Sequence, residues 1–125
     1  MRKVILLFAV SMALSAGVRS AEELSVDLMQ SIEDTNKSLS SNIALSNKQA
    51  ATADAKELTQ MFAQVETFFD HKGDAKNAVD LARQSKELST EIVGFVAVNN
   101  FESATTAATN LSRTCRTCHT FYKKE

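Results

Sequence analysis

Apolar residues recur at alternating spacings of three and four along most of the chain, which is the period of an amphipathic helix. This pattern predicts four helices separated by short polar segments. The predicted helices span residues 22–45, 50–69, 75–98 and 100–122. The chain has no proline and is rich in alanine, leucine, lysine, glutamate and glutamine, which favours helix by intrinsic propensity.

Each predicted helix carries one apolar stripe of the width expected for a seam between nearly antiparallel helices. In chain order the stripes are Met29-Ile32-Asn36-Leu39-Ile43, Ala51-Ala55-Leu58-Phe62-Val65-Phe69, Ala78-Leu81-Ser85-Leu88-Ile92-Phe95 and Phe101-Ala104-Ala108-Leu111-Cys115-Cys118-Tyr122. Helices of about twenty residues span roughly 30 Å, so the four match in length.

The segments between the helices contain capping and helix-ending residues. Residues 46–49 have the spacing of a capping box, and Asn99 with Glu102 has it again. Gly73 is expected to end the second helix and Asp74 to cap the third. Short connections place sequential helices side by side. The predicted fold is therefore all-α, an antiparallel up-down-up-down four-helix bundle.

The first twenty residues have the pattern of a secretory signal peptide. Two basic residues precede an apolar run over residues 4–14, which is too short to span a bilayer, and small residues follow. Val18 and Ser20 suit the −3 and −1 positions of a cleavage site before Ala21. We expect residues 1–20 to be removed on export to the periplasm, leaving residues 21–125 as one domain with no membrane span.

Charge narrows the choice of partners. Removal of residues 1–20 takes away three basic residues and no acidic one, which lowers the formal charge from −1 to −4. This balance argues against nucleic acid as a partner.

The chemistry is expected in the segment Cys115-Arg116-Thr117-Cys118-His119, which has the C-x-x-C-H pattern of covalent haem attachment. Two thiols one helical turn apart add to the two vinyl groups on one edge of the macrocycle, and the next imidazole ligates the iron. Both cysteines of the chain lie in this motif. We therefore expect haem c held by Cys115 and Cys118, with His119 as the proximal iron ligand.

Three other interpretations are open for the two cysteines. A haem-free dithiol redox protein would be expected in a βαβ setting, and no strand is predicted. A structural zinc site needs four ligands, and beyond Cys115, Cys118 and His119 the sequence offers His71 in a predicted surface turn. Inert core thiols would not explain the histidine that follows them.

The stripe positions place the haem inside the bundle. Cys115 and Cys118 continue the inward stripe of the last helix, whose end lies level with the start of the first helix in this topology. Met29 is at that level and carries a thioether that can ligate iron. We expect Met29 as a possible distal ligand and Met61 as ordinary packing, because it lies off the main stripe.

These features resemble the class II cytochromes c, that is, cytochrome c′ and its methionine-ligated low-spin relatives. The resemblance is carried by Cys115–Lys123, including the aromatic and basic residues after His119, and by Leu28–Ile32 on the first helix. It implies that the residue at position 29 faces the open side of the iron. The chain departs from the family at Ser25, where a basic residue is common, and in its lack of proline and tryptophan.

The leading hypothesis is a periplasmic electron-transfer protein that works with redox partner proteins and is not an enzyme. If Met29 does not ligate the iron, the resemblance implies a five-coordinate protein that binds nitric oxide or carbon monoxide. The haem-free dithiol protein is the third hypothesis. Pairing into a homodimer is a further possibility that the resemblance suggests.

Overall fold

The computed structural model describes residues 24–122 of the chain. The predicted signal peptide, residues 1–20, lies outside the described residues. Four helices account for nearly all of the described part: α1 (Val26–Ala44), α2 (Lys48–Lys72), α3 (Lys76–Ala97) and α4 (Phe101–Tyr122). No strand occurs in residues 24–122, so the all-α prediction is confirmed.

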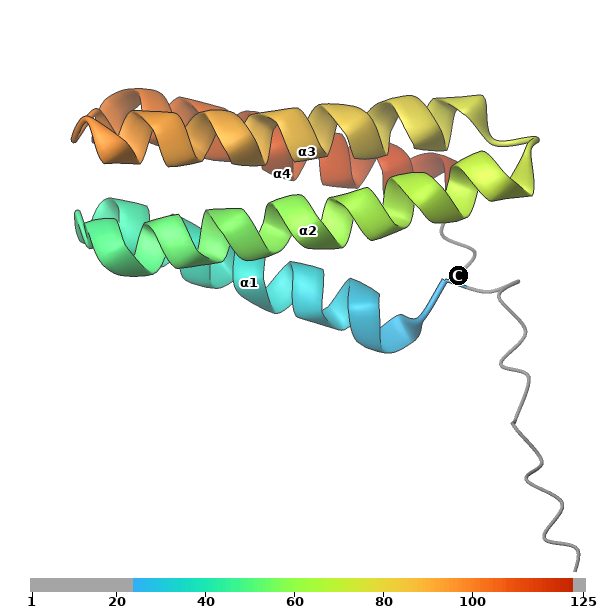
Figure 1. The fold of residues 1–125 in the computed structure, drawn as a ribbon, viewed down its shortest axis with the longest axis horizontal. Helices are drawn as coiled ribbons and strands as arrows, with labels where there is room; N and C mark the ends of the chain where they lie inside the picture. The colour runs from blue at the N-terminus through green and yellow to red at the C-terminus, as the bar shows by residue number, and fades with distance from the viewer. Residues whose placement is uncertain (1–23, 123–125) are drawn as a thin grey trace, which may run out of the picture.

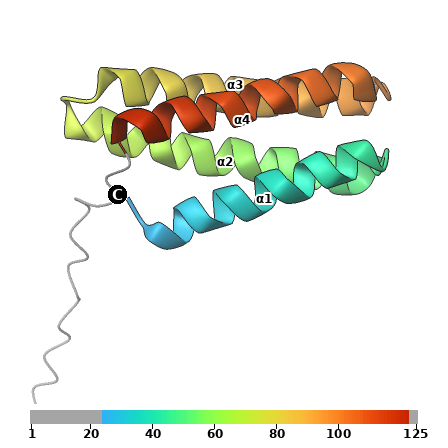
Figure 2. The same ribbon diagram turned by 180° about the vertical axis from the view of Figure 1, so that it is seen from behind.

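The four helices run alternately up and down and form one antiparallel bundle (Figures 1 and 2). Each helix packs against its two neighbours in a ring, since α1 contacts α2 and α4, and α3 contacts α2 and α4. The interface between α2 and α3 is the most extensive and that between α1 and α4 the least. Within the described part of the chain, none of the helices combines the length and apolar character needed to cross a membrane.

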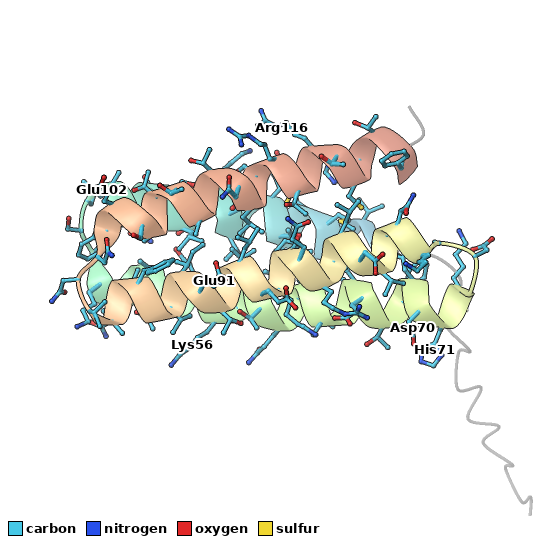
Figure 3. The ribbon with its side chains drawn as sticks, turned by 90° about the horizontal axis from the view of Figure 1, so that it is seen from above. Lys56, Asp70, His71, Glu91, Glu102 and Arg116 are labelled. Atoms are coloured by element: carbon cyan, nitrogen blue, oxygen red, sulfur yellow. The ribbon has the colours of Figure 1, made fainter. Side chains whose placement is uncertain are left out.

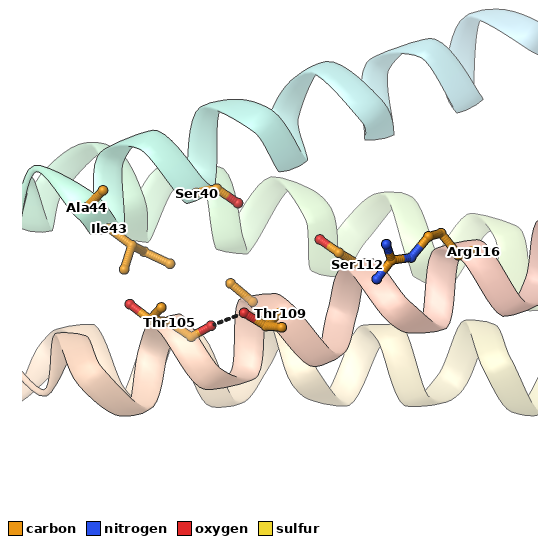
Figure 4. Close-up of a pocket in the computed structure, with 8 residues that line it drawn as sticks. Ser40, Ile43, Ala44, Thr105, Thr109, Ser112 and Arg116 are labelled. Carbon is orange, nitrogen blue, oxygen red and sulfur yellow. Dashed lines mark hydrogen bonds between the residues drawn. The ribbon is translucent and has the colours of Figure 1, made fainter.

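The two ends of the bundle are distinct. We call the end that carries the α1–α2 and α3–α4 connections the closed end. The opposite end, where α1 begins, α4 ends and α2 connects to α3, is the open end (Figure 1). Toward the open end α1 diverges from α4 (Figures 2 and 4).

The core follows the predicted stripes closely in α2 and less closely in α3. All six predicted stripe positions of α2 are buried, and Met61 is buried with them. In α3 the buried positions include Ala82, Ser89 and Val96, whereas the larger Leu81, Leu88 and Phe95 are half-buried. Because α3 packs against two neighbours, its small residues face the bundle axis and its larger residues lie toward the flanks.

The two connections at the closed end repeat one geometry. Ser46 and Asn99 have positive φ angles of 53° and 57°, and each ends its helix in the left-handed region. The next residue donates its backbone N–H five residues back, Asn47 to Asn42 and Asn100 to Phe95. These are the hydrogen bonds of a Schellman motif.

The N-caps of α2 and α4 differ from the prediction. Ser46 and Asn99 were expected to cap these helices, but both are in the left-handed conformation that ends the preceding helix. Asn47 and Asn100 cap the following helices instead, and their side chains accept hydrogen bonds from the backbone N–H of Ala50 and Ser103. The predicted caps at Ser46 and Asn99 are therefore wrong by one residue.

At the open end the connection between α2 and α3 is built differently. Gly73 has a φ of 80° and ends α2, as predicted. No breaker precedes it, so α2 continues through His71 and Lys72, which the prediction assigned to a turn. The predicted cap Asp74 is wrong, since Ala75 occupies the N-cap position of α3 without a side-chain hydrogen bond.

Candidate functional site: a cavity shared by the four helices

The C-x-x-C-H motif lies in the last two turns of α4, at the open end. Residues three and four apart share one face of a helix, so this helix directs Cys115, Cys118 and His119 to the same side. Both cysteines are half-buried and free of disulfide bonding, and His119 is exposed. The helix thus brings the three predicted site residues together.

All three residues line a cavity of about 250 Å³ at the open end. Every helix contributes to its wall. The lining residues are Met29, Ile32, Glu33 and Asn36 from α1, Phe62 and Val65 from α2, Leu81, Ala82 and Ser85 from α3, and Cys115, Cys118 and His119 from α4. We call this the four-helix cavity. Most of its lining is apolar, with the polar groups concentrated on α1 and α4.

Met29 lies in the wall that α1 contributes to this cavity, and the register of α1 against α4 sets its level. Asn36 Nδ2 donates a hydrogen bond of 3.2 Å to Ser112 Oγ, which joins the two antiparallel helices. Seven residues toward the open end from each partner are Met29 and His119, two turns or roughly 10 Å along the bundle. These two residues are therefore level with each other on neighbouring antiparallel helices.

The same register holds toward the closed end. Seven residues in the other direction from Asn36 and Ser112 are Ile43 and Thr105, and both line a second hollow between α1 and α4 (Figure 4). The hydrogen bond and the hollow thus agree on one alignment of α1 against α4. The level of Met29 relative to His119 follows from this alignment, which the Asn36–Ser112 hydrogen bond marks.

Asn36 is the site residue that the sequence reasoning missed. It was assigned to an apolar stripe, yet its Oδ1 is buried and accepts no hydrogen bond within the described residues. An unpaired buried carbonyl costs about 1–3 kcal/mol. The available signal was an asparagine among apolar residues at a heptad position between Met29 and Ile43.

The environment of the two thiols bears on their chemistry. Burial, with the neighbouring Cys118 adding to it, raises the pKa of Cys115 to about 11. Burial also raises the pKa of Cys118. Reactive dithiol sites work through a thiolate with a lowered pKa, so the shift here runs against the dithiol redox interpretation.

The remaining histidine is not brought to the cavity. His71 is exposed in the last turn of α2 and lies in a shallow surface hollow formed by residues of α2 alone (Figure 3). Arg116 also lies on the outside of the bundle, in the groove between α1 and α4 (Figures 3 and 4). Within the described ranges no three histidine, cysteine, aspartate or glutamate side chains gather as a metal site. His71 therefore does not complete a four-ligand zinc site.

The lining of the four-helix cavity suits a haem in its chemistry. Two thiols stand one turn apart on one wall, an imidazole follows them, and a thioether lies level with it across apolar side chains. The volume of about 250 Å³ is below the roughly 300–1,000 Å³ of ligand pockets, so a haem held by these residues would extend beyond the cavity. In comparisons with known proteins, no family model, curated protein or solved structure matches the chain.

Proposed function

We propose that the chain is a monohaem c-type cytochrome that transfers electrons in the periplasm, with His119 and Met29 as axial ligands. One observation carries the proposal. The three residues of the C-x-x-C-H motif line a single cavity, and Met29 of the neighbouring helix α1 lines the same cavity at the level of His119. A bound haem would supply one-electron exchange between ferric and ferrous iron.

Each residue of the chain has a distinct role in this proposal. Cys115 and Cys118 would hold the macrocycle by thioether bonds, and His119 would ligate the iron from α4. Met29 would ligate from α1 and raise the reduction potential relative to two nitrogen ligands. Apolar residues from the other walls, such as Phe62 and Leu81, would exclude water from the ring.

The packed core around the cavity suits electron transfer, because a fixed frame would change little when the iron is oxidised or reduced. Leu58, Leu111 and Ile92 are fully buried, and they hold three helices in place below the cavity. We propose no enzymatic reaction for this site. Redox partner proteins would be the physiological counterparts.

The experiment is the optical spectrum of the purified exported protein, ferric and ferrous, with and without carbon monoxide. The proposal predicts a low-spin spectrum that carbon monoxide does not change. Met29→Leu should give a high-spin ferrous iron that binds the gas. Met61→Leu is the matched control, since Met61 is buried on α2 and does not line the cavity, and it should leave the spectrum unchanged.

Other outcomes would favour the other hypotheses. A wild-type spectrum that is already high-spin and shifts with carbon monoxide would remove Met29 from the iron and favour a gas-binding protein. A protein exported together with the haem attachment machinery that shows no haem absorption would favour the dithiol interpretation.

A further inference from the structure

Asn36 occupies a position where an apolar residue would give the more stable bundle. It lies midway between Met29 and Ile43 at spacings of seven, on the seam that α1 presents to α4. Its Nδ2 is bonded to Ser112, but its Oδ1 is buried without a partner in the described residues. In coiled coils a single buried asparagine at such a position fixes the register of two helices at a cost in stability.

The interface that Asn36 bridges is the one most able to shift. Of the four interfaces between neighbouring helices, that between α1 and α4 is the least extensive, and α1 diverges from α4 toward the open end (Figure 4). Apolar packing alone fixes register weakly where few side chains interdigitate. One hydrogen bond placed where the helices begin to separate therefore has a large influence on the alignment of the segment beyond it.

We propose that Asn36 and Ser112 are a positioning pair, whose hydrogen bond sets the level of α1 against α4 so that Met29 stands opposite His119. The proposal rests on the proposed function, because it concerns how the second axial ligand is held. A slip by one residue would move Met29 about 1.5 Å along the axis and turn it about 100° around the helix. Neither change is compatible with ligation of a fixed iron.

The test compares Asn36→Leu, Ser112→Ala and the double variant in the haem-bearing protein. The readout is the rate of carbon monoxide binding to the ferrous iron, which reports how often Met29 leaves. Loss of one hydrogen bond should raise this rate roughly two- to tenfold. Because the two residues act through one bond, the double variant should match the single variants and show no further increase.

The matched control is Asn42→Leu, also on α1. Asn42 Nδ2 donates a hydrogen bond of 2.8 Å to Asp54 Oδ2 and ties α1 to α2, away from the cavity. This variant should leave the rate of carbon monoxide binding unchanged. Circular dichroism establishes that each variant retains its helix content, so that a faster rate is not a symptom of unfolding.

The outcomes separate this inference from the proposed function. A wild-type protein with methionine-ligated haem whose carbon monoxide rate is unchanged in Asn36→Leu and Ser112→Ala would overturn the positioning pair alone. An effect of Asn36→Leu without one of Ser112→Ala would also overturn it. A wild-type protein without haem, or with no Met29 on the iron, would overturn both proposals.

Discussion

The closed end and the open end of the bundle are made from the same four helices, yet they differ in their connections and helix caps. At the closed end two connections repeat the same Schellman geometry, with Asn47 and Asn100 capping the helices that follow. Lys48 Nζ adds a hydrogen bond of 2.9 Å to the carbonyl of Ala97, which joins these two connections. Ala51 and Val96 near this end are fully buried, whereas Leu45 and Val98, at its two connections, are exposed.

The open end differs in its connection and in the packing around it. Its α2–α3 connection has no side-chain cap, and both cysteines are half-buried around a cavity. Val26 and Phe121, at the start of α1 and the end of α4, are exposed. The bundle thus has one end whose connections are capped and joined by a hydrogen bond, and one end with a mostly apolar cavity.

The largest stability difference between the ends should appear on truncation of leucines. Leu58→Ala at a fully buried position of α2 should lower the free energy of unfolding by about 2–5 kcal/mol. Leu81→Ala, at a half-buried position that lines the cavity, should cost roughly 1–2 kcal/mol in the haem-free chain. Urea denaturation of both variants measures the difference. Equal losses would show that the cavity end is packed as tightly as the closed end.

A haem in the cavity should change the relative costs of the Leu58→Ala and Leu81→Ala substitutions. Leu81 would then contact the macrocycle, so Leu81→Ala should cost more in the haem-bearing protein than in the haem-free chain. Leu58 does not line the cavity, and its cost should not depend on haem.

A smaller effect should come from the ionic contacts beside the cavity. Lys86 Nζ lies 2.6 Å from Glu66 Oε2, and Arg83 Nε lies 3.1 Å from Glu66 Oε1. The hydrogen bond from Lys86, with that from Arg83, lowers the pKa of Glu66 below its ordinary value of 4.5. The stabilisation is fully present above the unfolded-state pKa and is lost as the pH falls through the lower folded-state pKa.

Glu66→Gln should therefore cost about 1 kcal/mol at pH 7, and the cost should vanish in acid below the folded-state pKa. Urea denaturation across this pH range measures it. Glu91→Gln, at an exposed position of α3, is the control and should be nearly neutral throughout. A cost for Glu66→Gln that does not depend on pH would contradict the assignment of the effect to charge.

The smallest predicted effect is an increase in the free energy of unfolding. Gly94 is exposed in the interior of α3, and a Cβ built there would meet no heavy atom within 4 Å. Gly94→Ala should raise the free energy of unfolding by about 0.5–1 kcal/mol through helix propensity, which thermal denaturation can detect. A loss would mean that the glycine has a contact or conformational role that this geometry does not contain.

The sequence predicted the helices well because their periodicity is local. The six stripe positions of α2 are all buried, since a helix with a wide apolar face has one orientation that buries it. In α3 the stripe was displaced by one position at Ala82, Ser89 and Val96. Serine and alanine give weak local signals, and their burial depends on which two helices flank them.

The cysteines and His119 were predicted as site residues from spacing, and their place inside the bundle near Met29 from the helix stripes, but the shape of the cavity was not predicted. It depends on where α1 lies relative to α4, and that register is fixed by Asn36 and Ser112, which are 76 residues apart. No local pattern contains that information. The N-caps at Asn47 and Asn100 were also missed. The left-handed residue before each of them moves the start of the following helix one residue along the chain.

The most direct test of the account is the intact mass of the chain after export in cells that carry the haem attachment machinery, measured under denaturing conditions. The account predicts a mass greater than that of the polypeptide by one haem, and loss of this increment in the variant with both Cys115→Ala and Cys118→Ala. A wild-type chain that is exported under these conditions and carries the mass of the polypeptide alone would contradict it.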